Sequence, residues 1–144
     1  MIKKRVVGVV TVRNGWAVQS FGYGRYLPLG KPEVLIENLD HWGADEIILQ
    51  CIDRTVSGAG PDMEVLEKIK RLGISTPLIY SGGIRCQDDA IRAISHGADR
   101  VMVESMMVDL PSSVEAMSRQ LGAQAIILNL PINIEFGELN YLDY

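Results

Sequence analysis

Five short apolar runs rich in valine and isoleucine, separated by helical patterns, constrain the fold of this chain more than any other feature of its sequence. The runs lie at residues 6–12, 46–52, 77–80, 100–103 and 125–130. Continuous apolar runs of this length are typical of strands that are buried on both faces of a parallel sheet. Apolar residues recur at three- and four-residue spacing, which predicts helices, in the segments 32–39, 62–70, 87–96 and 111–121. The alternating order of five strands and four helices predicts an α/β fold with right-handed crossovers.

A repeated turn indicates which α/β fold to expect. The sequence Gly-Ala-Asp opens one strand at residues 43–45 and another at 97–99, and a third turn, Gly-Ala-Gln, stands at 122–124. Each glycine suits the left-handed end of a helix. Two βα units in 54 residues correspond to about 27 residues per unit, near the ~31 of an eight-unit barrel.

We therefore expect TIM-barrel-type units that form about half of a (β/α)8 barrel, in one domain covering residues 1–144. An open, doubly wound sheet is the alternative. The glycine-rich fingerprint of dinucleotide-binding sheets is missing after the first run, where residues 11–16 follow another pattern.

Composition excludes several classes of function. A net charge of −4 gives no electrostatic reason to expect a nucleic acid or an anionic membrane as partner. No apolar run approaches the roughly 18 residues of a membrane span. Cys51 and Cys86 fit neither zinc-ligand spacing nor a disulfide framework. The sequence predicts a cytoplasmic chain without a metal or cofactor, and with Cys51 as a buried, inert thiol.

The carboxyl ends of the predicted strands hold the candidate site, because barrel active sites form there. Gly82 and Gly83 follow the third run, and their backbone N–H groups could approach an anion closely. The alternative is a tight turn with nothing bound. Ser105, after the fourth run, could donate to the same anion or cap its turn.

Two further loops border this end of the predicted sheet. The polar segment 52–60 contains Asp53, Arg54 and Ser57 and is predicted to be a mobile substrate loop; the alternative is a solvated loop with an Asp–Arg pair. An Asn-Gly turn at residues 14–15 predicts a hairpin whose second strand returns beside the first. The aromatic segment that follows could grip a substrate or serve as a lid.

Six stretches of the chain resemble, in order and spacing, the cyclase subunit of imidazole glycerol phosphate synthase. They are residues 4–7, 14–15, 43–46, 82–85, 97–100 and 121–125. The resemblance covers essentially the whole chain but only the first half of that family's barrel. It implies a (β/α)8-barrel lyase of histidine biosynthesis. Such a barrel binds a phosphoribosyl substrate through phosphate sites in both halves and takes ammonia from a glutaminase docked at its amino-terminal face.

The resemblance implies roles for individual residues at the carboxyl ends of the strands. Gly83 stands at the family's phosphate-binding glycine, and Ser105 stands where a phosphate-binding threonine is usual. Glu104 replaces the usual asparagine, and its carboxylate would repel a phosphate. The family's two catalytic aspartates fall at Thr11 and Pro131, and neither residue can supply general acid–base catalysis. The catalytic residues are therefore unassigned.

The opposite end of the predicted barrel departs less from the family. Arg5, Glu46 and Arg100 match the charged ring that gates the family's ammonia passage, and Asp99 matches a residue that faces the glutaminase. The alternative is that these charges pair with one another for stability.

From these residues we predict the barrel subunit of a glutamine-dependent, ammonia-channelling synthase that acts on a phosphorylated or nucleotide-linked sugar. Some relatives of the family work beside surface-polysaccharide genes. One alternative is a non-catalytic half-barrel that pairs with a second copy, because five strands cannot close a barrel and leave an open edge. Another is the genuine cyclase of histidine biosynthesis. Residues 135–144 are predicted to open a hairpin whose return strand is missing, which indicates a truncated chain or an obligate oligomer.

Overall fold

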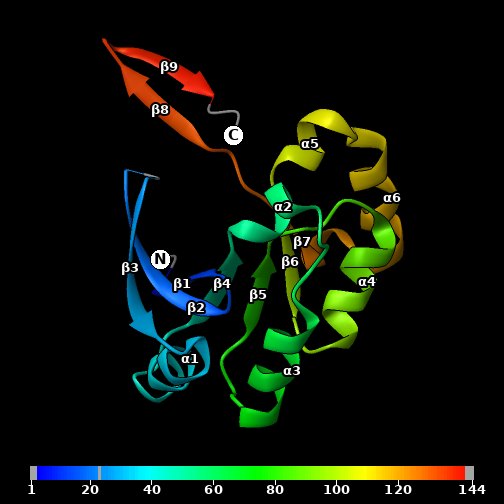
Figure 1. Cartoon of the computed structure of the whole chain (residues 1–144). Coiled ribbons are helices and arrows are strands. Elements are labelled where there is room, and N and C mark those ends of the chain that lie inside the picture. The colour runs from blue at the N-terminus through cyan, green and yellow to red at the C-terminus, as the bar shows by residue number, and fades with distance from the viewer. Residues whose placement is uncertain (1–2, 23, 142–144) are drawn as a thin grey trace.

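The computed structural model describes residues 3–22 and 24–141, and within them the main feature is one seven-stranded sheet (Figure 1). Its strand order is β3-β2-β1-β4-β5-β6-β7. The strands that run parallel are β1 (Val7–Arg13), β4 (Glu46–Cys51), β5 (Leu78–Ser81), β6 (Arg100–Val103) and β7 (Ile126–Leu128). These are the five strands that the apolar runs predicted.

An antiparallel hairpin extends the sheet beyond β1. Strand β2 (Trp16–Phe21) pairs with β1, and β3 (Arg25–Gly30) pairs with β2. Asn14 and Gly15 connect β1 to β2 with φ of 50° and 75°, the pair of left-handed residues that a two-residue hairpin turn requires. The predicted returning strand is confirmed, and the aromatic segment that follows continues into a third strand.

The four predicted helices are confirmed, and shorter ones accompany them. The long helices are α1 (Pro32–His41), α3 (Met63–Leu72), α4 (Gln87–Ser95) and α6 (Pro111–Leu121). The short elements are α2 (Asp53–Ser57), α5 (Ser105–Asp109) and the 3₁₀ turn η1 (Ala123–Ala125). Segment 52–60, expected to be a loop, therefore contains a helix. The left-handed Gly58, with φ of 67°, ends it.

One face of the parallel sheet carries the core. Alternate strand residues form a single buried cluster with residues of all four long helices; its strand members include Val12, Leu49, Tyr80 and Val101. On the other face, the β1 side chain of Val9 is 56% exposed, whereas Ile79 on β5 and Met102 on β6 are buried. A doubly wound sheet has helices on both faces. The observed one-sided cover is that of about half of a (β/α)8 barrel.

The Gly-Ala-Asp repeat ties the amino ends of neighbouring strands together. Asp45 accepts a hydrogen bond from the Val6 backbone N–H at 2.7 Å, and Asp99 accepts one from the Leu78 N–H at the same distance. The two aspartates also donate their backbone N–H groups to the carbonyls of those partners, at 2.9 and 2.8 Å. The glycine two residues before each aspartate is left-handed, with φ of 78° and 121°. In both copies of the repeat, the aspartate therefore joins the start of its own strand to the start of the neighbouring strand.

The expectation of a hairpin without its return strand is wrong. Strands β8 (Ile132–Glu135) and β9 (Glu138–Tyr141) pair in antiparallel fashion across Phe136 and Gly137, whose φ values are 53° and 84°. This hairpin projects from the carboxyl-end side of the main sheet (Figure 1). A local two-residue turn closes it, so no second chain is needed to complete it. Residues 142–144 of that expectation lie outside the described residues.

A carboxylate links the end of α1 to the loop before β5. Asp40 Oδ1 accepts hydrogen bonds from the backbone N–H groups of Ser75 and Thr76, and from the Thr76 hydroxyl at 2.7 Å. These donors hold the pKa of Asp40 below its usual value, with the Thr76 hydroxyl as the largest cause. The charged form of Asp40 therefore stabilises the folded chain.

We predict that Asp40→Asn destabilises the chain in a pH-dependent way. Because the pKa of Asp40 is lower in the folded state, its stabilisation is present above about pH 4, near the unfolded value, and is lost as pH falls through the folded pKa. Urea unfolding between pH 2 and 7 should show a gap between wild type and variant that closes below about pH 4. Asp109→Asn, at an exposed position, is the control. A gap that is independent of pH contradicts the prediction.

Candidate functional site

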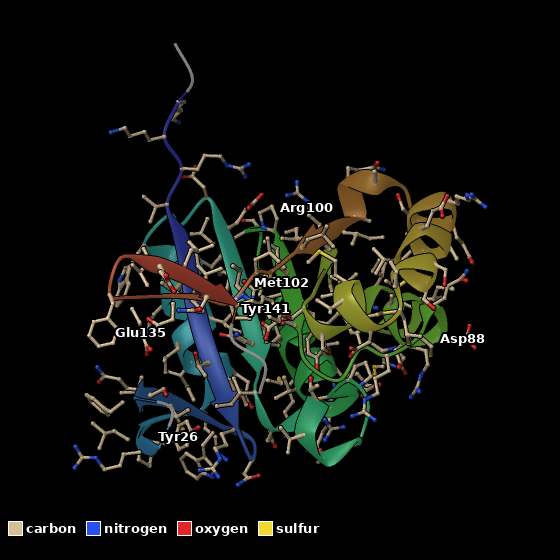
Figure 2. All side chains as sticks on the ribbon, turned by 90° about the horizontal axis from the view of Figure 1, so that it is seen from above. Tyr26, Asp88, Arg100, Met102, Glu135 and Tyr141 are labelled. Atoms are coloured by element: carbon tan, nitrogen blue, oxygen red, sulfur yellow. The ribbon has the colours of Figure 1, made fainter. Side chains whose placement is uncertain are left out.

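A cleft of about 790 Å³ lies at the carboxyl ends of the parallel strands. Strand β8 contributes Ile132 and β9 contributes Tyr141, so the terminal hairpin forms part of its wall. Figure 2 looks down on this region and labels Tyr141 and Met102 of β6, which both line the cleft. The polar side chains along its wall include Gln50, Asp53, Ser57, Ser81, Glu104, Ser105 and Asn129.

The cleft unites most, but not all, of the residues predicted for the carboxyl ends. The predicted residues that line it are Asp53, Ser57, Gly82, Gly83, Ser105 and Pro131. Thr11 and Arg54 are not among the lining residues. Thr11 lies on β1 between the core residues Val10 and Val12, and so on the inner face of the sheet, the same face as its register partner Gln50, which does line the cleft.

Gly82 and Gly83 form a turn that packs against two neighbouring backbone segments. Gly82 has φ of 125°, and a Cβ there would lie 2.2 Å from the Cys51 carbonyl oxygen. Gly83 has φ of 70°, and a Cβ there would lie 2.4 Å from the Gly60 carbonyl oxygen. The Gly83 N–H donates to Thr55 Oγ1 at 3.0 Å. An anion bound by this N–H therefore has to replace Thr55.

The predicted substrate loop is fastened at both ends of α2. The Arg54 guanidinium donates to the carbonyls of Ala59, Gly60 and Pro61, the bond to Gly60 measuring 2.7 Å. Asp53, by contrast, accepts a bond from the Asn14 N–H at 3.2 Å. The Asp–Arg pair of the alternative interpretation is thus replaced by two separate sets of partners, because α2 turns the two side chains in different directions.

Glu104 and Asn129 join the ends of β6 and β7. The Asn129 side-chain N–H donates to Glu104 Oε2, and the Asn129 backbone N–H donates to the Val103 carbonyl at 2.8 Å. Glu104 directly follows the predicted run 100–103 and Asn129 lies near the end of the run 125–130, which does not by itself pair them. The signal that could have found the pair is the adjacency of consecutive parallel strands, whose carboxyl ends meet at one edge.

The Cys51 thiol is buried behind the cleft, with 1% of the residue exposed. Burial raises its pKa to about 12, so the thiol is protonated at neutral pH. Its neighbour Tyr80 accepts a hydrogen bond from the Asp62 N–H at 2.7 Å, and burial raises the pKa of the Tyr80 hydroxyl. The predicted burial of Cys51 is confirmed.

A charged cluster occupies the opposite, amino-terminal end of the sheet. Glu46 Oε1 accepts hydrogen bonds from Arg5 Nη2 at 2.7 Å and from Arg100 Nη1 at 3.0 Å. The Glu46 side chain is only 10% exposed. Arg100 begins β6 and Glu46 begins β4, so the cluster bridges the start of β5 between them. Of the three residues predicted to form a charged ring, both arginines thus bind Glu46. The carboxylate of Asp99 binds the Leu78 N–H instead.

Residues 3–22 and 24–141 contain no group of three or more histidine, cysteine or acidic side chains that could hold a metal ion. No helix in that part of the chain has the length and apolar character needed to cross a membrane.

We predict that Gly82→Ala and Gly83→Ala each destabilise the chain by about 3 kcal/mol or more. The added methyl group meets backbone carbonyls that cannot rotate away, and it stands on a left-handed residue. Urea unfolding measures the loss. Gly24→Ala is the matched control because its Cβ has no neighbour closer than 3.8 Å. Losses below about 1 kcal/mol at both positions would show that the turn has room to shift.

We also predict that iodoacetamide at pH 8 labels one cysteine in the native chain and two in urea. Cys86 is exposed and free, whereas Cys51 is buried and protonated at that pH. Mass spectrometry counts the labels. The variant Cys86→Ser should take up no label until it is unfolded, and rapid native labelling of that variant is the contrary result.

Comparison with known proteins gives the family of this chain. A family model described as "Histidine biosynthesis protein" matches residues 5–138. The imidazole glycerol phosphate synthase subunit HisF of Staphylococcus saprophyticus is 32% identical over 141 residues, which are 97% of this chain and 55% of that protein. The HisF subunit of Sulfurisphaera tokodaii is 31% identical over 92% of this chain and 53% of its own length, and that of Metallosphaera sedula is 33% identical over 89% and 51%. The chain spans about half the length of these relatives. Since the family model covers nearly all of it, the chain belongs to the histidine biosynthesis protein family, as a divergent relative of the HisF subunits.

Proposed function

We propose that this chain is the barrel part of a glutamine-dependent, ammonia-channelling synthase that acts on a phosphorylated or nucleotide-linked sugar. The observation that carries the proposal is the Arg5–Glu46–Arg100 cluster, which lies at the end of the sheet opposite the cleft. A glutaminase subunit would dock at this amino-terminal face. Ammonia released there would pass the cluster and react in the cleft.

The inner face of the sheet offers a suitable path between the two ends. Ile48, Ile79 and Met102 lie on this face, since their neighbours in β4, β5 and β6 pack into the core on the other side. Apolar side chains favour neutral ammonia over the ammonium ion, because an ion pays a large cost for leaving water. Glu46 would admit ammonia when one of its two arginine bonds opens.

The cleft has the chemistry of an acceptor site with a changed set of catalytic groups. Threonine at position 11 and proline at 131 carry no titratable group. Within the described residues, the carboxylates that line the cleft are Asp53 and Glu104. An acid or base for ammonia addition would therefore come from these two side chains rather than from the positions that the family uses.

The acceptor's phosphate would bind near Gly82, Gly83 and Ser105. Ser105 lines both the cleft and an adjoining cavity of about 170 Å³. Arg85 lines the smaller cavity and brings a guanidinium group to it. A phosphate placed between Ser105 and Arg85 would find a hydroxyl and a guanidinium that also donates to the Thr55 carbonyl at 2.7 Å, with the carboxylate of Asp109 on the wall of the same cavity.

A second candidate is an assembly module that pairs with another half-barrel and has no catalytic role. The exposed inner-face residues Val7 and Val9 favour it, because a second set of strands would cover them. Residues 1–144 would then act as one half-barrel domain, and a second copy would complete the barrel. Light scattering separates the candidates: a well-folded monomer at working concentration contradicts obligate pairing.

We predict that Glu46→Gln disrupts the coupling to a glutaminase. The chain is co-expressed with a glutaminase subunit, and glutamine hydrolysis by the purified complex is measured. The substitution removes the charge that holds both arginines, so we expect stimulation of hydrolysis to fall at least tenfold. Arg5→Ala should act in the same direction.

Arg119→Ala is the control for this experiment, because Arg119 lies on α6 in an exposed pair with Glu115. Its stimulation should stay within twofold of wild type. A chain that binds neither a glutaminase nor any sugar phosphate contradicts the proposal. If expression of this chain restored growth of a cyclase-deficient strain without histidine, the result would instead support the genuine cyclase of histidine biosynthesis.

A further inference from the structure

At the β6–β7 end of the cleft, the side chains of Glu104 and Asn129 leave two acceptor oxygens and one Asn129 N–H without a partner among the described residues. Glu104 Oε2 is occupied by the Asn129 N–H, whereas Oε1 accepts no hydrogen bond from any described residue. The Asn129 side chain has turned its nitrogen toward the carboxylate, and so its Oδ1 is left as an acceptor that no described residue uses. Both residues line the cleft.

The charges around this pair disfavour an anion. Among the described residues, the charged ones that line the cleft are Arg13, Asp53 and Glu104. The Arg13 guanidinium lies 4.3 Å from the centre of the Tyr26 ring. Apart from Arg100 at the amino end of β6, neither β6 nor β7 contains a lysine or an arginine.

The carboxylate at position 104 limits what this place can bind, because it accepts hydrogen bonds and cannot donate one to a phosphate oxygen. Two acceptor oxygens against one remaining N–H favour a ligand group that donates hydrogens.

Resting on the proposed function, we propose that Glu104 and Asn129 form a specificity-determining acceptor pair that binds a hydroxyl or amino group of the sugar and excludes phosphate from the β6–β7 end of the cleft. Glu104 is the binding residue. Asn129 is a positioning residue, because it fixes the orientation of the carboxylate from the next strand. The phosphate of the acceptor is thereby directed away from this pair, toward the side of Ser105 that Arg85 borders.

The test measures two probes by NMR titration of the isolated chain, inorganic phosphate and glucosamine. In Glu104→Asn and Glu104→Gln we expect phosphate to bind at least tenfold more tightly than in wild type, and glucosamine at least fivefold more weakly. Asn129→Ala should weaken glucosamine binding without tightening phosphate binding, a pattern that a merely structural role does not produce. Glu115→Gln, at an exposed pair on α6, is the control and should change neither affinity by more than twofold.

Smaller changes in either probe for the Glu104 variants overturn the proposal, as does a wild-type chain that binds no glucosamine. Thermal unfolding of each variant shows whether it is folded. If one of the two substitutions at position 104 unfolds the chain, the other still tests the proposal. Since no glutaminase is present, the outcome is independent of the coupling experiment. A chain can thus fail to stimulate a glutaminase and still show the acceptor pair, or the reverse.

Discussion

Burial of one face of the parallel sheet beneath four helices is the constraint on which the other features depend. Side chains such as Val12, Leu49 and Tyr80 point into this layer, and each fully buried apolar side chain contributes about 1.5–3 kcal/mol. Because residues alternate along a strand, burying one set fixes the other set on the inner face. The same burial fixes the register of the strands, and so aligns their amino ends at one edge and their carboxyl ends at the other.

The two edges of the sheet carry different chemistry for that reason. At the amino edge, aspartates of the repeat bind the backbone N–H groups of neighbouring strands, and the nearly buried Glu46 carboxylate binds two partly exposed arginines. At the carboxyl edge, glycine turns, short helices and the β8–β9 hairpin enclose a cleft with polar walls. A single sheet therefore separates a charged, self-paired end from an end with acceptor groups directed into open space. This separation is what a subunit needs if one reactant enters at one end and the other binds at the opposite end.

The accuracy of the sequence predictions follows from how local each signal is. The parallel strands and long helices were predicted because period and apolar content are properties of neighbouring residues, and the Asn14–Gly15 turn was predicted for the same reason. Helix α2 was missed because it is only five residues long, and the β8–β9 return was missed because its strands are short and exposed. The hydrogen bond from the Gly83 N–H to the Thr55 hydroxyl joins residues 28 positions apart, and no local sequence pattern predicts such a pair.

The sequence by itself determined the half-barrel architecture, the family, and the grouping of Arg5, Glu46 and Arg100 at one end of the sheet. Periodic burial is sufficient for the architecture, since parallel order follows from right-handed crossovers, whereas the family and the charged grouping follow from the resemblance of six stretches of the chain. Only the tertiary structure decided which polar atoms of the cleft are already occupied. The Gly83 N–H donates to the Thr55 hydroxyl, and the Asn129 side chain donates to one oxygen of Glu104, 25 positions away in the chain. Each polar group has a fixed number of donors and acceptors. What a site can still bind therefore depends on which of them are already bonded to residues distant in the sequence.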